Sequence, residues 1–215
     1  MMKEDRIMKI VGILKDRYGN RARGEVASTS SRKPFEVLVS AVISQRNKDE
    51  VTERVAGGLL KQARTPAKMK CLGRKGIERA IKSANFYKTK ADRIYRISEI
   101  VTDRYGGKVP STRDEIVKLP GVGGKTADIV LLVSHGKDVI PVDTHVSVIS
   151  NRLGWTDSEN GEKIREDLHK IFPKRMRGYV NIILVEFGKE FCRKHRPKCD
   201  PCPIREMCPY PDKNL

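Results

Sequence analysis

The chain has 215 residues, and its 44 Lys and Arg residues outnumber its 27 Asp and Glu residues, giving a formal net charge of +17. A chain this basic suits a polyanionic partner such as nucleic acid, although a ribosomal or membrane-surface protein would share the property. No apolar stretch approaches the roughly 18 to 20 residues that cross a bilayer, which argues against a membrane protein. We expect a soluble, intracellular protein of the cytoplasm or nucleoid that is not secreted.

Nearly every periodic segment predicts a helix. Three of these segments carry a stripe of apolar residues. We expect the helix with the first stripe to end at Gly19 and the helix with the second to end at Gly106, because glycine is common just past a helix end. Thr156 and Glu159 are the expected cap of the helix with the third stripe. The run Pro34–Ile43 favours a buried helix, because it is long for a strand and begins with proline. The residues of the three stripes are Ile7, Ile10, Val11, Leu14 and Tyr18; Ala91, Ile94, Ile97, Val101 and Tyr105; and Ile164, Leu168, Ile171 and Phe172.

A glycine-rich turn separates two further predicted helices. Thr112 and Glu115 match a capping box that opens the first of them, and Pro120 ends it. The second, largely buried helix begins at Lys125. Three glycines between the helices supply the backbone freedom for a tight reversal: Gly121, Gly123 and Gly124. The pattern predicts a helix-hairpin-helix.

Backbone N–H groups in such a turn, beside the positive end of a helix, bind a phosphate oxygen whatever the base. Lys125 stands at this end, where the helix dipole disfavours an ammonium ion and so favours the neutral, nucleophilic amine. A nucleotide-binding loop is excluded, because it requires a glycine where the chain has Leu119. The turn alone leaves open that Lys125 is a plain phosphate contact.

A carboxylate follows the turn. Asp143 lies 18 residues after Lys125, in the segment Pro141–His145. An amine nucleophile and a carboxylate partner are the groups that covalent catalysis requires. Together with the phosphate-binding turn, they indicate chemistry on DNA.

Four of the five cysteines fall in the last 24 residues, as Cys192-x6-Cys199-x2-Cys202-x5-Cys208. Thiolates at such short spacing hold zinc or an iron-sulfur cluster, and the ligand type does not separate the two. Disulfides are the weaker alternative, because the spacing is too crowded for a secreted framework. Cys71 is an isolated thiol of the core or the surface.

The hairpin with its lysine, the Val-Asp-Thr-His segment and the cysteine spacing together resemble the endonuclease III family of DNA glycosylases. The resemblance covers nearly the whole chain, and the segments Pro34–Val39 and Phe86–Ala91 also resemble family segments in the right order. It implies a 4Fe-4S cluster, with Lys125 as nucleophile and Asp143 as its partner. The implied cluster ligands are Cys192, Cys199, Cys202 and Cys208.

The resemblance also implies an all-α fold of two helical lobes with a DNA-binding cleft between them. One lobe is a six-helix barrel that carries the helix-hairpin-helix, and we place it at residues 27–137. Residues 1–26 and 138–215 form the other, discontinuous lobe, which holds the cluster loop. Lys125 and Asp143 are expected on opposite sides of the cleft.

In the family, side chains fill the gap that a flipped nucleotide leaves. The position of the usual glutamine here holds Arg46, with Gln45 beside it, and Phe86 replaces a common leucine, so the residue that faces the orphaned base is open. His145 borders this space or packs between helices. Cations between Cys192 and Cys199 are expected to contact phosphates, although a solvated charge run is the alternative. The predicted DNA-binding residues are Gln45, Arg46, Phe86, Gly121, Gly123, Gly124, Thr126, His145, Arg193, Lys194, Arg196 and Lys198.

The implied function is that of a bifunctional DNA glycosylase and abasic-site lyase in base excision repair. The expected substrate is double-stranded DNA with an oxidised or ring-saturated pyrimidine or an abasic site, bound by a monomer and cleaved by β-elimination through a lysine Schiff base. One alternative is a glycosylase for T/G, U/G or A/G mismatches, but those relatives commonly lack the hairpin lysine. A second alternative is a non-catalytic DNA-binding protein, which the pairing of Lys125 with Asp143 makes less attractive.

Overall fold

A computed structural model describes residues 3–29 and 33–214, and within these ranges the chain forms ten α-helices, one 3-10 helix and no strand. The all-α prediction is confirmed. None of the described helices is long and apolar enough to cross a membrane.

The chain divides into two compact units. Residues Ser30–Gly136 form the first, called here the hairpin unit. Met1–Thr29 and Lys137–Leu215 form the second, called the cysteine unit. The domain limits at residues 27 and 137 stay a prediction.

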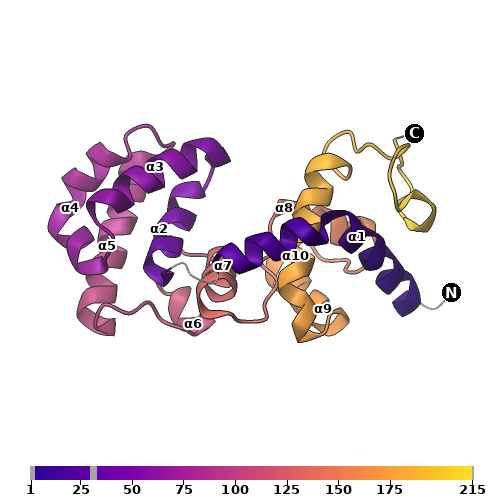
Figure 1. Ribbon diagram of the computed structural model, residues 1–215, viewed down its shortest axis with the longest axis horizontal. Helices are drawn as coiled ribbons and strands as arrows, with labels where there is room; N and C mark the ends of the chain where they lie inside the picture. The colour runs from indigo at the N-terminus through magenta and orange to yellow at the C-terminus, as the bar shows by residue number, and fades with distance from the viewer. Residues whose placement is uncertain (1–2, 30–32, 215) are drawn as a thin grey trace. The chain divides into compact units, whose positions relative to one another are not determined.

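Six helices lie within the described part of the hairpin unit. Helices α4 and α5 run side by side, and α2 packs against α3, α5 and α7 (Figure 1). The core of this unit includes Leu38, Ile43, Leu59 and Ile94, all of them fully buried. The helices are α2 (Pro34–Ser44), α3 (Asp49–Gln62), α4 (Pro66–Ala80), α5 (Tyr87–Tyr105), α6 (Arg113–Ile116) and α7 (Gly124–His135).

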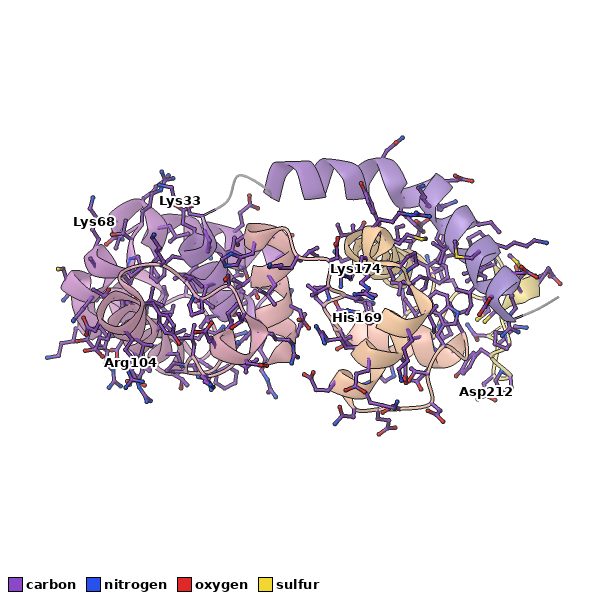
Figure 2. All side chains as sticks on the ribbon, turned by 90° about the horizontal axis from the view of Figure 1, so that it is seen from below. Lys33, Lys68, Arg104, His169, Lys174 and Asp212 are labelled. Atoms are coloured by element: carbon purple, nitrogen blue, oxygen red, sulfur yellow. The ribbon has the colours of Figure 1, made fainter. Side chains whose placement is uncertain are left out.

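The cysteine unit combines the N-terminal helix with the last third of the chain. Helix α1 packs along α10, and α8 packs against both α9 and α10. In the core, the rings of Trp155 and Phe172 meet edge to face with their centroids 5.3 Å apart. His169 and Lys174, labelled in Figure 2, lie near the end of α9 and at the start of α10. The helices are α1 (Lys3–Thr29), α8 (Thr144–Arg152), α9 (Gly161–Ile171), α10 (Lys174–Glu190) and the 3-10 helix η1 (Arg205–Met207).

The surface of the hairpin unit accounts for part of the excess positive charge. Lys33, Lys68 and Arg104 are exposed there (Figure 2). Such scattered charges attract a polyanion without setting its position.

The apolar stripes of the first two predicted helices lie on α1 and α5, but only one of the two predicted ends is right. Gly106 adopts φ +57° and ends α5 as expected. Gly19 is not among the described glycines with positive φ, and α1 continues to Thr29. A glycine ends a helix when it turns into the left-handed region, and residue type alone does not decide whether it does.

The predicted cap of α9 is wrong. Asn160, rather than Thr156 and Glu159, caps α9, and its side chain accepts hydrogen bonds from the N–H groups of Glu162 and Lys163 at 2.9 and 3.2 Å. The Thr156 hydroxyl instead donates to Asp167 at 2.8 Å. Asparagine is among the best helix caps, and here it stands immediately before the first helical residue.

The capping box expected before α6 is not formed. Thr112 is the residue before the helix, but its side chain makes no cap hydrogen bond to the backbone. Its hydroxyl donates to the Glu115 carboxylate at 2.5 Å. The two residues therefore pair with each other rather than with the orphan N–H groups of the first turn.

Candidate active site

Helices α6 and α7 form the predicted hairpin. The Val122 N–H donates to the Leu119 carbonyl at 3.1 Å and closes the turn. Gly121 adopts φ +73°, a conformation that glycine takes at little cost. The N-cap of α7 is Gly123, whose carbonyl accepts from the Ala127 N–H at 3.0 Å. The first-turn N–H groups before Ala127 lie outside this intrahelical pattern, which is the arrangement that binds anions.

Lys125 is the second residue of α7, and its side chain is exposed. Its neighbour Thr126 is buried, with 7% of its surface exposed, and so offers little surface to a phosphate. An exposed lysine amine thus stands at the start of α7, beside the turn.

An ion pair holds the two helices of the hairpin together. Arg113 of α6 lies with its Nε 3.1 Å from an oxygen of Asp128 on α7. The Asp128 side chain is 2% exposed and the Arg113 side chain 22%. A carboxylate this deeply buried requires its cation, because desolvation penalises a lone charge. The pair fixes the second helix, and with it Lys125, against the first.

Asp143 caps α8 in the cysteine unit. Its Oδ1 accepts a hydrogen bond from the Val146 N–H at 2.9 Å, and its carbonyl accepts from the Ser147 N–H at 2.9 Å. The residue is half-buried. A negative group is favoured at the positive end of a helix, so the fold holds this carboxylate in a defined place.

His145 packs closely on α10. A Cβ atom placed on Gly188 would lie 2.4 Å from the Nδ1 atom of His145, so glycine is required there by the approach of the ring. His145 is half-buried. Of its two predicted roles, the packing role is the one for which the structure gives a contact.

Two loops of the hairpin unit meet where the gap-filling residues were predicted. Asn47 accepts from the Asn85 N–H at 2.9 Å, and the Asn85 side chain donates to the Arg46 carbonyl at 2.8 Å. The Arg46 guanidinium lies 5.9 Å from the centroid of the Phe86 ring. Both residues are exposed, Phe86 to 62%. Sequence reasoning missed the two asparagines, which bind the loops to each other.

Lys90 of α5 lies beneath these loops and is 2% exposed. Its Nζ donates to the Ile43 carbonyl at 2.7 Å, near the C-terminal end of α2. Burial lowers the pKa of Lys90 from its ordinary value, and the charge of Arg93 lowers it further. A cation at the end of α2 complements the helix dipole and supports the loop that follows.

The four clustered cysteines line one pocket of the cysteine unit, together with apolar residues that include Leu153, Phe187 and Ile204. All four are half-buried. Burial raises the pKa of Cys202 to about 11, and it raises that of Cys192 above 9.0 although Arg152 opposes the shift. In the described ranges, no three Cys, His, Asp or Glu side chains converge on a point that would hold a single metal ion. The four thiols around this pocket could hold a group that takes sulfur ligands.

Arg152, the last residue of α8, secures the cysteine loop and was missed by sequence reasoning. It donates to Cys192 Sγ at 3.4 Å, to the Arg193 carbonyl at 2.7 Å and to the Lys194 carbonyl at 2.9 Å. Its guanidinium also lies 4.8 Å from the centroid of the Tyr210 ring. The predicted cations of this loop are all exposed: Arg193, Lys194, Arg196 and Lys198. Cys71 is an exposed thiol elsewhere.

The sequence matches the family model described as "HhH-GPD superfamily base excision DNA repair protein" over residues 39–174. The class defined by the fold and the hairpin is thus that of helix-hairpin-helix proteins of base excision repair. Endonuclease III of Thermotoga maritima is 42% identical over 177 residues, which cover 82% of this chain and 83% of the relative. Endonuclease III of Escherichia coli is 33% identical, with coverage of 84% and 85%. The chain belongs to the endonuclease III family.

Solved structures of similar proteins have the same fold. A trapped endonuclease III–DNA covalent intermediate matches with a TM-score of 0.86 and 30% identity, over 98% of this chain and 97% of the other. A thermostable thymine-DNA glycosylase shares the fold, with a TM-score of 0.83 at 23% identity. The predicted family, the enzyme class of DNA glycosylase and abasic-site lyase, and DNA as the partner are confirmed.

Proposed function

We propose that this enzyme excises oxidised or ring-saturated pyrimidines from double-stranded DNA and nicks abasic sites, acting as a monomer. The observation that carries the proposal is the exposed Lys125 at the start of α7, in a hairpin whose N–H groups suit a phosphate. A nucleotide inside a duplex is reached only after it is flipped out, at a cost that is smaller for damaged pairs.

In the proposed reaction, the neutral amine of Lys125 attacks C1′ of the flipped nucleotide. The bond between C1′ and the base breaks, and the base leaves with the electron pair. Asp143 stabilises the positive charge that develops at the sugar, as a fixed carboxylate of a capped helix end can. After the amine loses a proton, the nitrogen lone pair forms the C=N bond as the C1′–O4′ bond breaks, and O4′ leaves with the electron pair and takes up a proton. The sugar ring is then open, and the protonated imine acidifies C2′.

The second half of the reaction is β-elimination. A C2′ proton is removed, the C3′–O bond breaks, and the 3′ phosphate leaves with the electron pair. Hydrolysis of the imine then releases Lys125 as an amine. Excision and strand cleavage are therefore successive steps on one covalent adduct.

We also propose that Cys192, Cys199, Cys202 and Cys208 hold a 4Fe-4S cluster. The four half-buried thiols around one pocket supply the sulfur ligands that such a cluster takes, which supports the proposal. The bound group would supply a cross-link and no redox step on the substrate. Arg193, Lys194, Arg196 and Lys198 would then meet phosphates from a loop of fixed shape.

The function is tested with duplexes that carry one thymine glycol, one abasic site or one undamaged T/G mismatch. We expect excision and a β-elimination nick on the thymine glycol duplex, a β-elimination nick on the abasic duplex, and neither product on the mismatch within the same time. A protein that cleaves the mismatch and leaves thymine glycol intact would contradict the proposed substrate class.

A further inference from the structure

The hairpin unit carries a second concave surface, which the proposed reaction does not use. It is a groove of about 740 Å³, and every residue that lines it belongs to this unit. We call it the basic groove, after its three exposed cations Lys33, Arg64 and Lys108. Its volume lies in the range of roughly 300 to 1,000 Å³ that is usual for ligand sites.

The floor of the basic groove is apolar. Phe35 and Val109 are 5% and 8% exposed. Pro66 and Pro110 are also buried, and Tyr105 is half-buried. Proline has no N–H group and aromatic rings present apolar faces, so this floor offers an occupant contact area rather than hydrogen bonds. It suits an apolar or aromatic side chain.

The charges around the groove favour an anion. The Arg64 side chain is 66% exposed, and its Nε lies 3.7 Å from a Glu36 oxygen, a pairing that contributes little at the surface. Lys33 precedes α2 without capping it through its side chain, so the positive end of that helix adds to the cations. Among the lining residues, Glu115 supplies the opposing carboxylate. Three cations and one carboxylate leave the groove net positive.

The basic groove and the predicted DNA contacts of this unit lie at opposite ends of the same helices (Figure 1). Helix α2 begins at the groove and ends directly before Gln45. Helix α5 begins directly after Phe86 and ends at the groove. Helix α7 begins at the phosphate-binding turn and ends at His135, which lines the groove. At a rise of about 1.5 Å per residue, the 11 residues of α2 span about 16 Å.

Hydrogen bonds hold the far end of the unit together. Gln45 Nε2 donates to the Gly121 carbonyl at 3.0 Å, and Gln45 Oε1 accepts from Arg93 Nη1 at 3.2 Å. The loop after α2 and the phosphate-binding turn are thus in contact, away from the basic groove. An occupant of the groove therefore leaves these predicted DNA contacts uncovered.

We propose that the basic groove docks an acidic peptide segment of a partner protein. An aromatic side chain of the peptide packs on the apolar floor, and its carboxylates pair with Lys33, Arg64 and Lys108. A DNA duplex fits less well, because its phosphates supply the charge but no apolar side chain for the floor. The enzyme can thereby hold a partner and its substrate at once, whichever lesion it excises.

The full-length protein is tested by fluorescence anisotropy with a labelled peptide of the sequence Asp-Asp-Phe-Pro-Asp-Asp-Phe. Two control peptides carry Asn for every Asp or Ala for every Phe. We expect wild type to bind the first peptide about tenfold more tightly than either control peptide. A protein that binds polyanions without a built site would bind the Ala peptide equally well, and that result, or no binding at all, would overturn the proposal.

Substitutions locate the site. Lys108→Glu reverses a charge of the groove, and Ala67→Trp fills the groove from an exposed position on α4. Lys75→Glu is the control, because Lys75 is exposed on α4 but does not line the groove. We expect Lys108→Glu and Ala67→Trp each to weaken the peptide by about tenfold and Lys75→Glu to stay within about twofold. Circular dichroism checks that each variant is folded, and equal losses in Lys108→Glu and Lys75→Glu would contradict the groove as the site.

Competition with DNA separates the two classes of occupant. A duplex with a tetrahydrofuran abasic analogue should leave the bound peptide in place. The Kd of Lys108→Glu for this duplex should equal that of Lys75→Glu within about twofold, and Ala67→Trp should match wild type, because the groove lies at the other end of the helices from the DNA contacts. Displacement of the peptide by the duplex, or equal losses of peptide and duplex binding in Ala67→Trp, would make the groove a DNA surface and overturn the proposal.

Discussion

Asp143 accepts a hydrogen bond from the backbone N–H of Val146, so the proposed catalytic carboxylate is also the N-cap of α8. Its structural and chemical roles are separable, because asparagine caps a helix about as well as aspartate but carries no charge. We predict that Asp143→Asn keeps the wild-type free energy of unfolding and loses excision. Asp143→Ala should lose excision and also about 1 kcal/mol of stability. Urea denaturation and single-turnover excision check both, and full excision by Asp143→Asn would remove Asp143 from the chemistry.

The ion pair between Arg113 and Asp128 should be a main support of the hairpin. Asp128→Ala leaves a partly buried guanidinium without this partner, and we expect a loss of about 3 kcal/mol in the free energy of unfolding. Asp114→Ala is the control, because Asp114 is an exposed aspartate of α6, the helix that carries Arg113. Equal effects of the two substitutions in urea denaturation would show that the pair does not stabilise the hairpin.

The contact between α1 and α10 predicts a pH dependence. Hydrogen bonds from Arg17 and then Tyr18 hold the pKa of Glu190 below its ordinary 4.5. A lowered carboxyl pKa means that Glu190 stabilises the fold above pH 4.5 and that this contribution is lost as the pH falls through the lowered value. We expect Glu190→Gln to be less stable than wild type at pH 7, with the difference shrinking below pH 4.5. A difference in Tm that is constant from pH 7 to the acid limit would refute the linkage.

Substitutions distinguish the four clustered cysteines, which we propose to bind the cluster, from Cys71. Cys202→Ser should lower the iron content and the visible absorption of the purified protein, since Cys202 is one of the four thiols around the pocket. Cys71→Ser, which alters an exposed thiol elsewhere, should change neither. Iron analysis after anaerobic purification tests this, and a zinc-loaded, colourless wild type would contradict the cluster assignment.

Sequence patterns predicted the all-α fold, the hairpin and most of the helices, because apolar spacing and glycine-rich turns reflect local requirements. The errors at Gly19, Thr112 and Thr156 concern helix ends, where several polar residues compete for the same backbone groups. The sequence alone does not show which of these residues caps or ends the helix.

The contacts made by Arg93 and Arg152 could not be predicted from sequence. Arg93 meets Gln45, 48 residues earlier, and Arg152 meets Cys192, 40 residues later. In a chain with 44 Lys and Arg residues, no local pattern distinguishes an arginine that holds a loop from one that is solvated. Folding brings these partners together, so the signal lies in tertiary structure alone.

Lys125 is the residue that we propose to form the covalent bond to DNA. Wild type, Lys125→Gln and Lys118→Gln are incubated with a thymine glycol duplex and with an abasic duplex, and borohydride is added; Lys118 is the control because it is an exposed lysine of the same hairpin. We predict a covalent protein–DNA band for wild type and Lys118→Gln on both duplexes, and no band for Lys125→Gln despite retained binding to a tetrahydrofuran duplex. An undiminished band from Lys125→Gln would contradict the account.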